Sequence, residues 1–181
     1  MIYESQPWKQ EVARHIRTID AWTKKVHTQK GCFLIERGIF LSAFIVRKLI
    51  ENKKMTDRLK GRTFRCRSYK PFRPLSDRVM QAWGVADIDK QYDLSKPSIV
   101  QSSFYDLSSE IMHSYIFVPE VGDNGDFVSF FINSYREQDN RLLSISIDAY
   151  QKALKLAVVD DVVSARVYKD PKTGRIKTKL N

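Results

Sequence analysis

Positive charge is concentrated in two parts of this chain that are far apart in the sequence. Arg47 to Trp83 contains 12 basic and 3 acidic residues, and Ser164 to Asn181 contains 6 basic and 1 acidic residue. Between them, Gly84 to Asp126 contains 2 basic and 8 acidic residues, and the whole chain has a net charge of +10. Charge gathered in one place builds a stronger local potential than the same charge spread evenly. This distribution therefore predicts a surface that attracts polyanions.

The residue types of the basic segment suit contact with phosphates and bases. Arginine outnumbers lysine between Arg58 and Arg78, and a planar guanidinium group forms two parallel hydrogen bonds with a phosphate. Exposed aromatic side chains between the cations can stack on unpaired bases. We therefore expect a surface that binds DNA or RNA. The residues expected to form it are Arg58, Lys60, Arg62, Arg65, Arg67, Tyr69, Lys70, Arg73, Lys172, Arg175 and Lys177.

The same charge pattern leaves other interpretations open. Gly84 to Asp126 could fold back and neutralise the basic segment, because runs of charge are often only solvated faces. An acidic protein or a phosphoinositide surface would also be attracted by the potential. The leading prediction is a non-enzymatic basic accessory domain that binds nucleic acid or another polyanion. The alternative is a protein–protein adaptor or a subunit of a larger complex, with another protein or a second copy as the partner.

A small carboxylate and imidazole cluster is the main candidate for catalysis. Asp106, Glu110 and His113 lie four and three residues apart, so in a helix they project from one face. Glu110 and His113 could hold a metal ion, but a histidine at a helix end is also favoured by the macrodipole. Asp160 and Asp161 could hold magnesium, although helix capping explains them more simply. We predict no metal site and no cofactor, and a metal-dependent phosphodiesterase-like enzyme ranks last.

The cysteines and the apolar stretches bear on the compartment. Cys32 and Cys66 are far apart and form no CxxC pair, which predicts buried structural thiols in a reducing compartment. Met1 to Lys9 has no positive stretch followed by an apolar core, so we expect no secretory signal and a cytoplasmic location. The most apolar stretch, Phe33 to Ile50, is interrupted by charged residues, which predicts a core helix and no membrane span.

The first third of the chain has the periodicity of two helices followed by a strand. Apolar residues at spacings of three and four predict a helix from Pro7 to about Val26, ended by Gly31, and a second from Phe33 to Lys54. Gly38 within the second helix predicts a close approach of a neighbouring backbone. From Arg62 to Tyr69 the period becomes two, so Phe64 and Cys66 should point inward while Arg65 and Arg67 point outward.

The rest of the chain predicts a sheet with further helices. A brief helix around residues 76–83 and an irregular acidic stretch to Gln101 should precede a helix capped by Ser103 and ending near His113. Alternation and turn residues then predict a meander of three strands, a helix that Asp148 caps, and a terminal hairpin. The ranges expected for these are 115–121, 127–135 and 141–148 for the strands, 148–163 for the helix, and 166–169 with 175–179 for the hairpin.

These elements predict one α+β domain over residues 1–181. Two N-terminal helices should pack on one face of a mainly antiparallel sheet, with a C-terminal β-hairpin. Within it we distinguish an N-terminal helical part of about residues 1–55, a basic strand and loop segment 56–83, and a sheet-rich part 104–181. Apolar residues on both faces of the strand at 127–135 predict that the sheet is covered on two sides, by this chain or by another.

Overall fold

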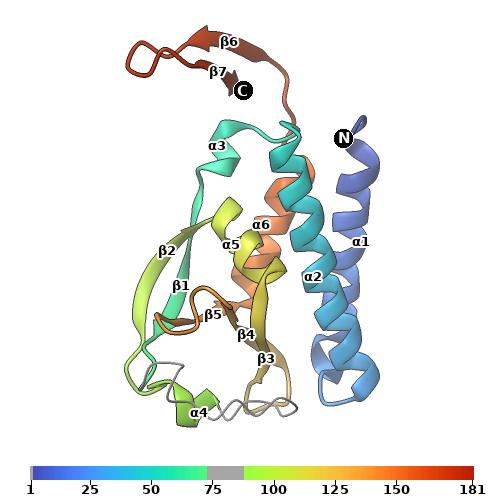
Figure 1. Ribbon diagram of the computed structural model, residues 1–181. Helices are drawn as coiled ribbons and strands as arrows, with labels where there is room; N and C mark the ends of the chain where they lie inside the picture. The colour runs from blue at the N-terminus through green and yellow to red at the C-terminus, as the bar shows by residue number, and fades with distance from the viewer. Residues whose placement is uncertain (1, 73–87) are drawn as a thin grey trace.

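A computed structural model describes residues 2–72 and 88–181 of the protein. Its helices are α1 (Gln6–Trp22), η1 (a 3₁₀ turn, Thr23–Lys25), α2 (Gln29–Glu51), α3 (Asp57–Lys60), α4 (Ile88–Gln91), α5 (Phe104–Met112) and α6 (Ile147–Val159). Its strands are β1 (Thr63–Tyr69), β2 (Ser98–Ser103), β3 (Ser114–Val121), β4 (Phe127–Ser134), β5 (Leu142–Ser146), β6 (Ala165–Lys169) and β7 (Ile176–Leu180). The predicted α+β fold is confirmed, with two N-terminal helices, a five-stranded antiparallel sheet and a terminal hairpin (Figure 1).

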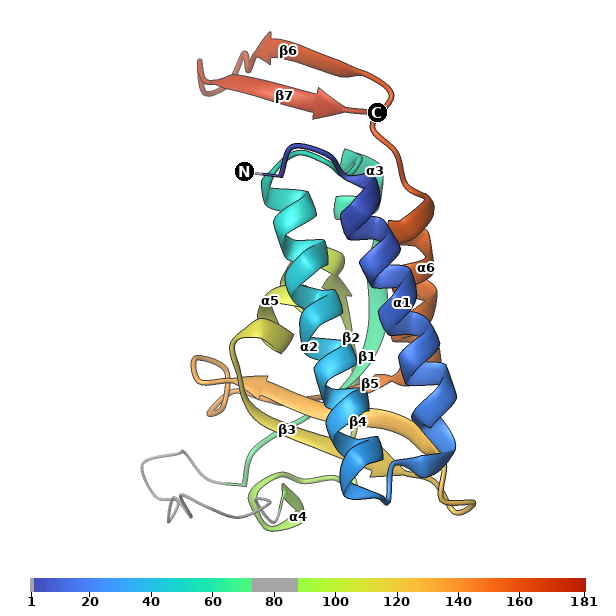
Figure 2. The same cartoon turned by 90° about the vertical axis from the view of Figure 1, so that its right-hand side faces the viewer.

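The two long helices lie side by side, as Figure 2 shows. The second begins at Gln29, earlier than Phe33, because Thr28 caps it by accepting a hydrogen bond from the backbone N–H of Gly31. Gly31 therefore stands in the first turn of α2 and does not end the first helix. A side chain at that position would collide with the backbone carbonyl of Lys25, because an added Cβ would lie 1.9 Å from its oxygen.

Gly38 permits the close contact between these helices that the sequence predicts. A Cβ added at Gly38 would lie 3.0 Å from Cγ1 of Ile19 and 3.7 Å from the backbone oxygen of His15. Ile19 is fully buried, so its side chain has little room to yield. The glycine costs about 1 kcal/mol of helix propensity relative to alanine, and the close approach of α1 accounts for its presence.

The sheet has the strand order β2-β1-β5-β4-β3, and all of its described pairings are antiparallel. The predicted strands of the meander and the predicted strand near Phe64 are confirmed. Strand β2 is new, because residues 98–103 lie in and just after the stretch expected to be irregular. Its sequence shows no clear alternation of apolar and polar residues. Pairing with β1 along six residue pairs makes it a strand.

One face of the sheet carries the main core. Phe64, Cys66, Phe130 and Ile132 belong there to one cluster with buried residues of α2, α5 and α6. At the start of α5, Ser103 accepts a hydrogen bond from the N–H of Asp106, and the helix ends at His113, both as predicted. The N-cap position of α6 is Ser146, not Asp148, and the helix ends at Val159, short of the expected residue 163.

The opposite face of the sheet has a second, smaller core. Tyr69, Ile116, Phe131 and Leu142 are buried there together with Tyr92, which follows α4. The expectation of a sheet covered on two sides is therefore confirmed for this part of the sheet, and residues of the same chain provide the cover. The helix expected at residues 76–83 lies outside the described residues.

The terminal hairpin extends away from the rest of the molecule, beyond α3 and the end of α6 (Figures 1 and 2). All five residues of β6 are exposed, and Leu180 is the one buried residue of β7. The predicted terminal hairpin is thus confirmed, and it is exposed. No helix among the described residues is long and apolar enough to cross a bilayer.

Candidate anion-binding cleft

Strand β1 presents its arginines to solvent as the alternating pattern predicts. Arg65 and Arg67 are exposed, and Cys66 between them is buried. Arg65 stands opposite Gln101 of β2, and Arg67 stands between Ile99 of β2 and Ser144 of β5. The two guanidinium groups therefore lie on the polar half of the sheet face that the second core leaves uncovered.

Tyr69 is a correction to the expected binding surface. Its side chain is only 4% exposed, and its ring lies 5.9 Å from that of Phe131 in the second core. Alternation places Tyr69 on the same face as Arg65 and Arg67, but Tyr92 and its neighbours cover that end of the face. A buried ring cannot stack on a nucleotide base, so Tyr69 has a structural role.

The short helix α3 is held in place by the end of α6 and by the terminal hairpin. Asp160 accepts hydrogen bonds from the N–H of Thr56 at 2.8 Å and from its Oγ1 at 2.7 Å. Asp57 accepts a hydrogen bond from the N–H of Leu180 at 2.8 Å. Lys53 adds a contact, since its Nζ donates to Oγ1 of Thr178 at 3.2 Å. The basic segment and the basic tail therefore meet at α3.

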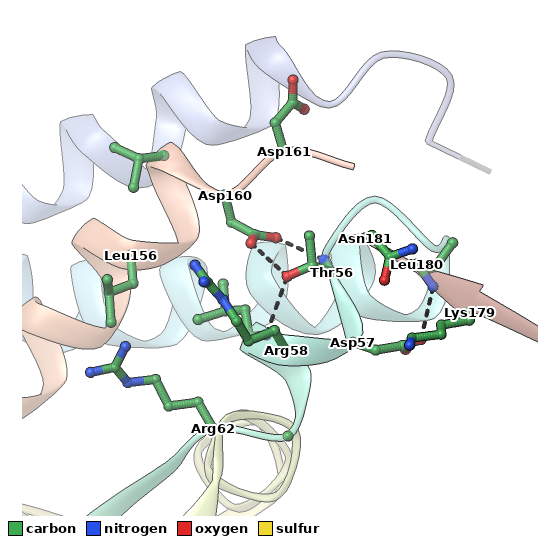
Figure 3. A pocket seen from close by; sticks show the side chains of 13 residues that line it. Thr56, Asp57, Arg58, Arg62, Leu156, Asp160, Asp161, Lys179, Leu180 and Asn181 are labelled. Carbon is green, nitrogen blue, oxygen red and sulfur yellow. Dashed lines mark hydrogen bonds between the residues drawn. The ribbon is translucent and has the colours of Figure 1, made fainter. Parts of the chain in front are cut away.

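A cleft of about 990 Å³ lies at this meeting point (Figure 3). Residues from α3 and the start of β1, from the end of α6, and from the end of β7 line it. Its cationic residues are Arg58, Arg62 and Lys179, all of them exposed. The structure thus brings two of the expected arginines together with a lysine more than a hundred positions later in the chain.

The carboxylates of the cleft are already engaged by groups of the chain. Asp160 accepts from Thr56 and Asp57 accepts from Leu180. Asp161 pairs with Nζ of Lys9 at 3.2 Å, and Figure 3 shows its side chain turned toward α1. Lys9 is only 2% exposed although it belongs to α1, so this ion pair is largely shielded on its cationic side.

The cations of the cleft have no such partners. Within residues 2–72 and 88–181, no carboxylate lies within ion-pair distance of Arg58, Arg62 or Lys179. In Figure 3 the guanidinium groups of Arg58 and Arg62 both extend toward the side where Leu156 lies. Leu156 and Val159 give that side an apolar wall, and Val159 is 76% exposed. The arrangement offers two guanidinium groups to an anion from solvent.

The other expected cations are distributed along the strand and the hairpin. Lys60 and Lys70 are exposed near the two ends of β1. Lys172 and Arg175 are exposed at the tip of the hairpin, which lies away from the sheet. Arg73 lies outside the described residues. The expected residues therefore form a cleft group, a strand group and a hairpin-tip group, and not one compact patch.

Lys177 differs from the other expected cations of the hairpin, because its charge is compensated. Its Nζ pairs with the carboxylate of Asp170 across the hairpin. The hydrogen bond from Lys177 lowers the pKa of Asp170 to about 2, and the same contact raises the pKa of Lys177. Both groups therefore stay charged at neutral pH, and Lys177 contributes little free positive charge.

The candidates for catalysis serve the fold in the described part of the chain. Glu110 is 8% exposed and accepts from the N–H of Ser134 at 3.1 Å while it pairs with Arg141 at 3.3 Å. No group of three metal-ligating side chains occurs among the described residues. Burial raises the pKa of Cys66 to about 11, against a smaller opposite effect of Arg141, and burial also raises the pKa of Cys32. Neither thiol is activated as a nucleophile.

Sequence reasoning misses Lys179 as a member of the site. The only local signal is the alternation of β7, which puts Lys177 and Lys179 on one face. Contact between β7 and α3 depends on Asp57 and Leu180, which lie 123 residues apart. Comparisons of the chain with protein-family models, with curated proteins and with solved structures gave no significant match. Fold and site thus define a class: a basic α+β protein with a cleft that is lined by three cations and three carboxylates.

Proposed function

We propose that this protein is a non-enzymatic accessory domain that binds nucleic acid, or another polyanion, through its phosphates. The single observation that supports the proposal is the cleft, where Arg58, Arg62 and Lys179 meet without carboxylate partners in the described structure. Arginine and lysine that neutralise phosphates release condensed counterions, which supplies sequence-independent affinity. The two thiols, which are free, suit a reducing compartment, so we place this role in the cytoplasm.

The arginines of β1 form a second group of exposed cations, apart from the cleft. Arg62 precedes the strand, whereas Arg65 and Arg67 lie within it on the exposed side. Residues two apart on one face of a strand lie about 7 Å apart. Along the axis of a duplex, successive phosphates of one strand are about 3.4 Å apart, so this spacing corresponds to about two nucleotides. Two successive contacts with one phosphate backbone can therefore form at Arg65 and Arg67, on the sheet face opposite the helices.

Salt dependence of binding is the direct test of this proposal. If about 5 phosphates of a duplex are neutralised, the log-log slope of affinity against salt should be about −4.5. The double change Arg58→Ala and Arg62→Ala should flatten that slope by about 1.8 and weaken binding to all sequences alike. Arg14→Ala with Arg17→Ala is the matched control, because it removes the same charge from exposed positions of α1. Absence of salt-sensitive binding to both DNA and RNA would overturn the proposal.

A second candidate function is association with another copy of this chain, and the terminal hairpin favours it. Val163, Val167 and Ile176 are 83%, 66% and 78% exposed. An isolated two-stranded hairpin is only marginally stable in water, so uncovered apolar side chains on such a ribbon indicate a partner. This observation replaces the two-sided sheet as the reason for the adaptor alternative, because residues of the same chain cover the apolar part of both sheet faces.

The free edge of β6 is suited to pairing with its own copy. Ser164 and Asn181 exchange two backbone hydrogen bonds, and the N–H of Asp170 donates to Arg175. Antiparallel alternation then turns the N–H and C=O groups of Ala165, Val167 and Lys169 outward. Two such edges can pair about a two-fold axis at Val167, which brings the exposed valines together. Light scattering should then give twice 21.1 kDa, and Val167→Asp should restore the monomer. Val121→Asp is the control at another exposed valine, and a monomer at every concentration would rule this candidate out.

A further inference from the structure

We propose that the cleft binds a terminal phosphomonoester, the phosphate at the end of a polynucleotide strand. The inference rests on the proposed function and specifies the ligand of the same site. Three features of the cleft support it: the paired arginines, the apolar wall beside them, and the carboxylates that bound the cleft elsewhere. Each of these features suits a phosphate at the end of a strand. Together they disfavour a strand whose backbone continues through the cleft.

The paired guanidinium groups match the charge of a monoester. A phosphomonoester carries a charge of about −1.5 to −2 at pH 7 and three terminal oxygens, whereas a phosphodiester carries one charge. Arg58 and Arg62 each offer five N–H donors in a fixed planar arrangement. Both extend to the same side of the cleft, and neither has a carboxylate partner in the described structure. Two guanidinium groups can therefore share one dianion.

The apolar wall gives the first nucleoside a place to lie. Val159 is 76% exposed at the end of α6, and Leu156 lies one turn earlier on the same helix. Both side chains line the cleft, and Figure 3 shows Leu156 on the side toward which the guanidinium groups extend. A nucleoside attached to the bound phosphate would cover this apolar surface, which adds affinity that inorganic phosphate cannot gain.

The carboxylates argue against a strand that passes through the cleft. Asp57, Asp160 and Asp161 all line it, and the side chain of Asp161 is 74% exposed although it pairs with Lys9. A backbone that continued past the arginines would bring phosphates close to these negative charges, which repel them. A strand that ends in the cleft avoids that repulsion.

The test compares single strands of one sequence that differ only in their ends. Fluorescence anisotropy of the full-length protein would measure binding of a 5′-phosphorylated, a 3′-phosphorylated and an unphosphorylated oligonucleotide. We expect one phosphorylated end to bind about tenfold more tightly than the unphosphorylated strand, because the dianion makes additional charge-assisted hydrogen bonds. A nucleoside monophosphate and inorganic phosphate serve as competitors. If either free compound competes at a concentration as low as the phosphorylated strand, the ligand is a small phosphate and not a polynucleotide end, which overturns the inference.

Variants separate this inference from the proposed function. Arg58→Ala with Arg62→Ala should abolish the preference for a phosphorylated end, and Arg58→Lys with Arg62→Lys should reduce it while the charge is kept. Arg65→Ala with Arg67→Ala should weaken all three oligonucleotides equally and leave the preference unchanged. All four positions are exposed, so the fold should survive, and circular dichroism checks it. Equal binding of the three oligonucleotides overturns the inference but leaves the proposed function standing. Binding of none of them overturns both.

Discussion

The basic segment around β1 and the basic hairpin at the C-terminus have similar charge but differ in how they are supported. Around β1 the exposed cations alternate with buried residues such as Cys66 and follow the buried Leu59, so a core fixes their positions. On the hairpin, Leu180 is the one buried apolar residue, and Lys177 is neutralised by Asp170. A high count of positive residues therefore makes a preorganised site only where the backbone beneath is held by apolar contacts.

The largest expected difference between the α3–β1 region and the terminal hairpin is in the free energy of unfolding. Leu59→Ala removes a side chain that is 5% exposed beneath α3 and should lower the free energy of unfolding by about 2–5 kcal/mol. Ile176→Ala, at a side chain that is 78% exposed on β7, should change it by no more than about 0.5 kcal/mol. Urea unfolding of the two variants measures both values. Equal losses would mean that the hairpin is as firmly packed as α3.

A second experiment uses thiol reactivity to compare the two regions. Burial raises the pKa of Cys66 from 9.0 to about 11, so its thiolate fraction at neutral pH is on the order of 100-fold below that of an ordinary thiol. In a Val167→Cys variant, the introduced thiol on β6 should react with iodoacetamide at least that much faster. Residue-specific mass spectrometry measures both rates. Because the deprotonated form reacts, the rate at Cys66 should rise about tenfold per pH unit up to about 11. Similar rates at both positions would show that β1 opens as readily as the hairpin.

The sequence predicts the elements whose signals lie within their own residues. Period-two alternation from Arg62 to Tyr69 predicts β1 and the outward direction of Arg65 and Arg67, and turn residues predict both hairpins. Strand β2 is missed because residues 98–103 are mostly exposed and polar, so only the pairing with β1 makes them a strand. Strands with a clear local pattern can be predicted from sequence, whereas a strand such as β2 forms only because a distant strand pairs with it.

The cleft is harder to predict than the strands, for the same reason. Its cations become neighbours through contacts between distant segments, such as the hydrogen bond from Thr56 to Asp160. Tyr69 shows the converse case. Its position in the alternating pattern is right for the face of Arg65 and Arg67, yet Tyr92 of a later segment covers that end of the face. Alternation specifies a face, and tertiary contacts decide whether solvent reaches it.

The smallest expected effect tests whether the hairpin contributes charge to polyanion binding. Asp170→Asn leaves Lys177 without its partner and makes it available to a phosphate, so the salt slope of duplex binding should steepen by about 0.9. Asp123→Asn is the matched control, since it makes the same charge change in the turn between β3 and β4, at the other end of the molecule. Electrophoretic or fluorescence titration at several salt concentrations measures both slopes.

The pH dependence of the Asp170 and Lys177 pair provides a second test of the Asp170→Asn variant. Lys177 lowers the pKa of Asp170 to about 2, so the carboxylate keeps its charge, and neutralises Lys177, from pH 8 down to pH 4. The pair's stabilisation is full above the ordinary pKa of Asp170 and is lost only as the pH falls toward 2. Between pH 4 and 8, the difference in slope between the wild-type protein and Asp170→Asn should therefore stay constant. If Asp170→Asn changes the slope no more than Asp123→Asn, Lys177 does not face the polyanion, and the binding surface ends at the cleft.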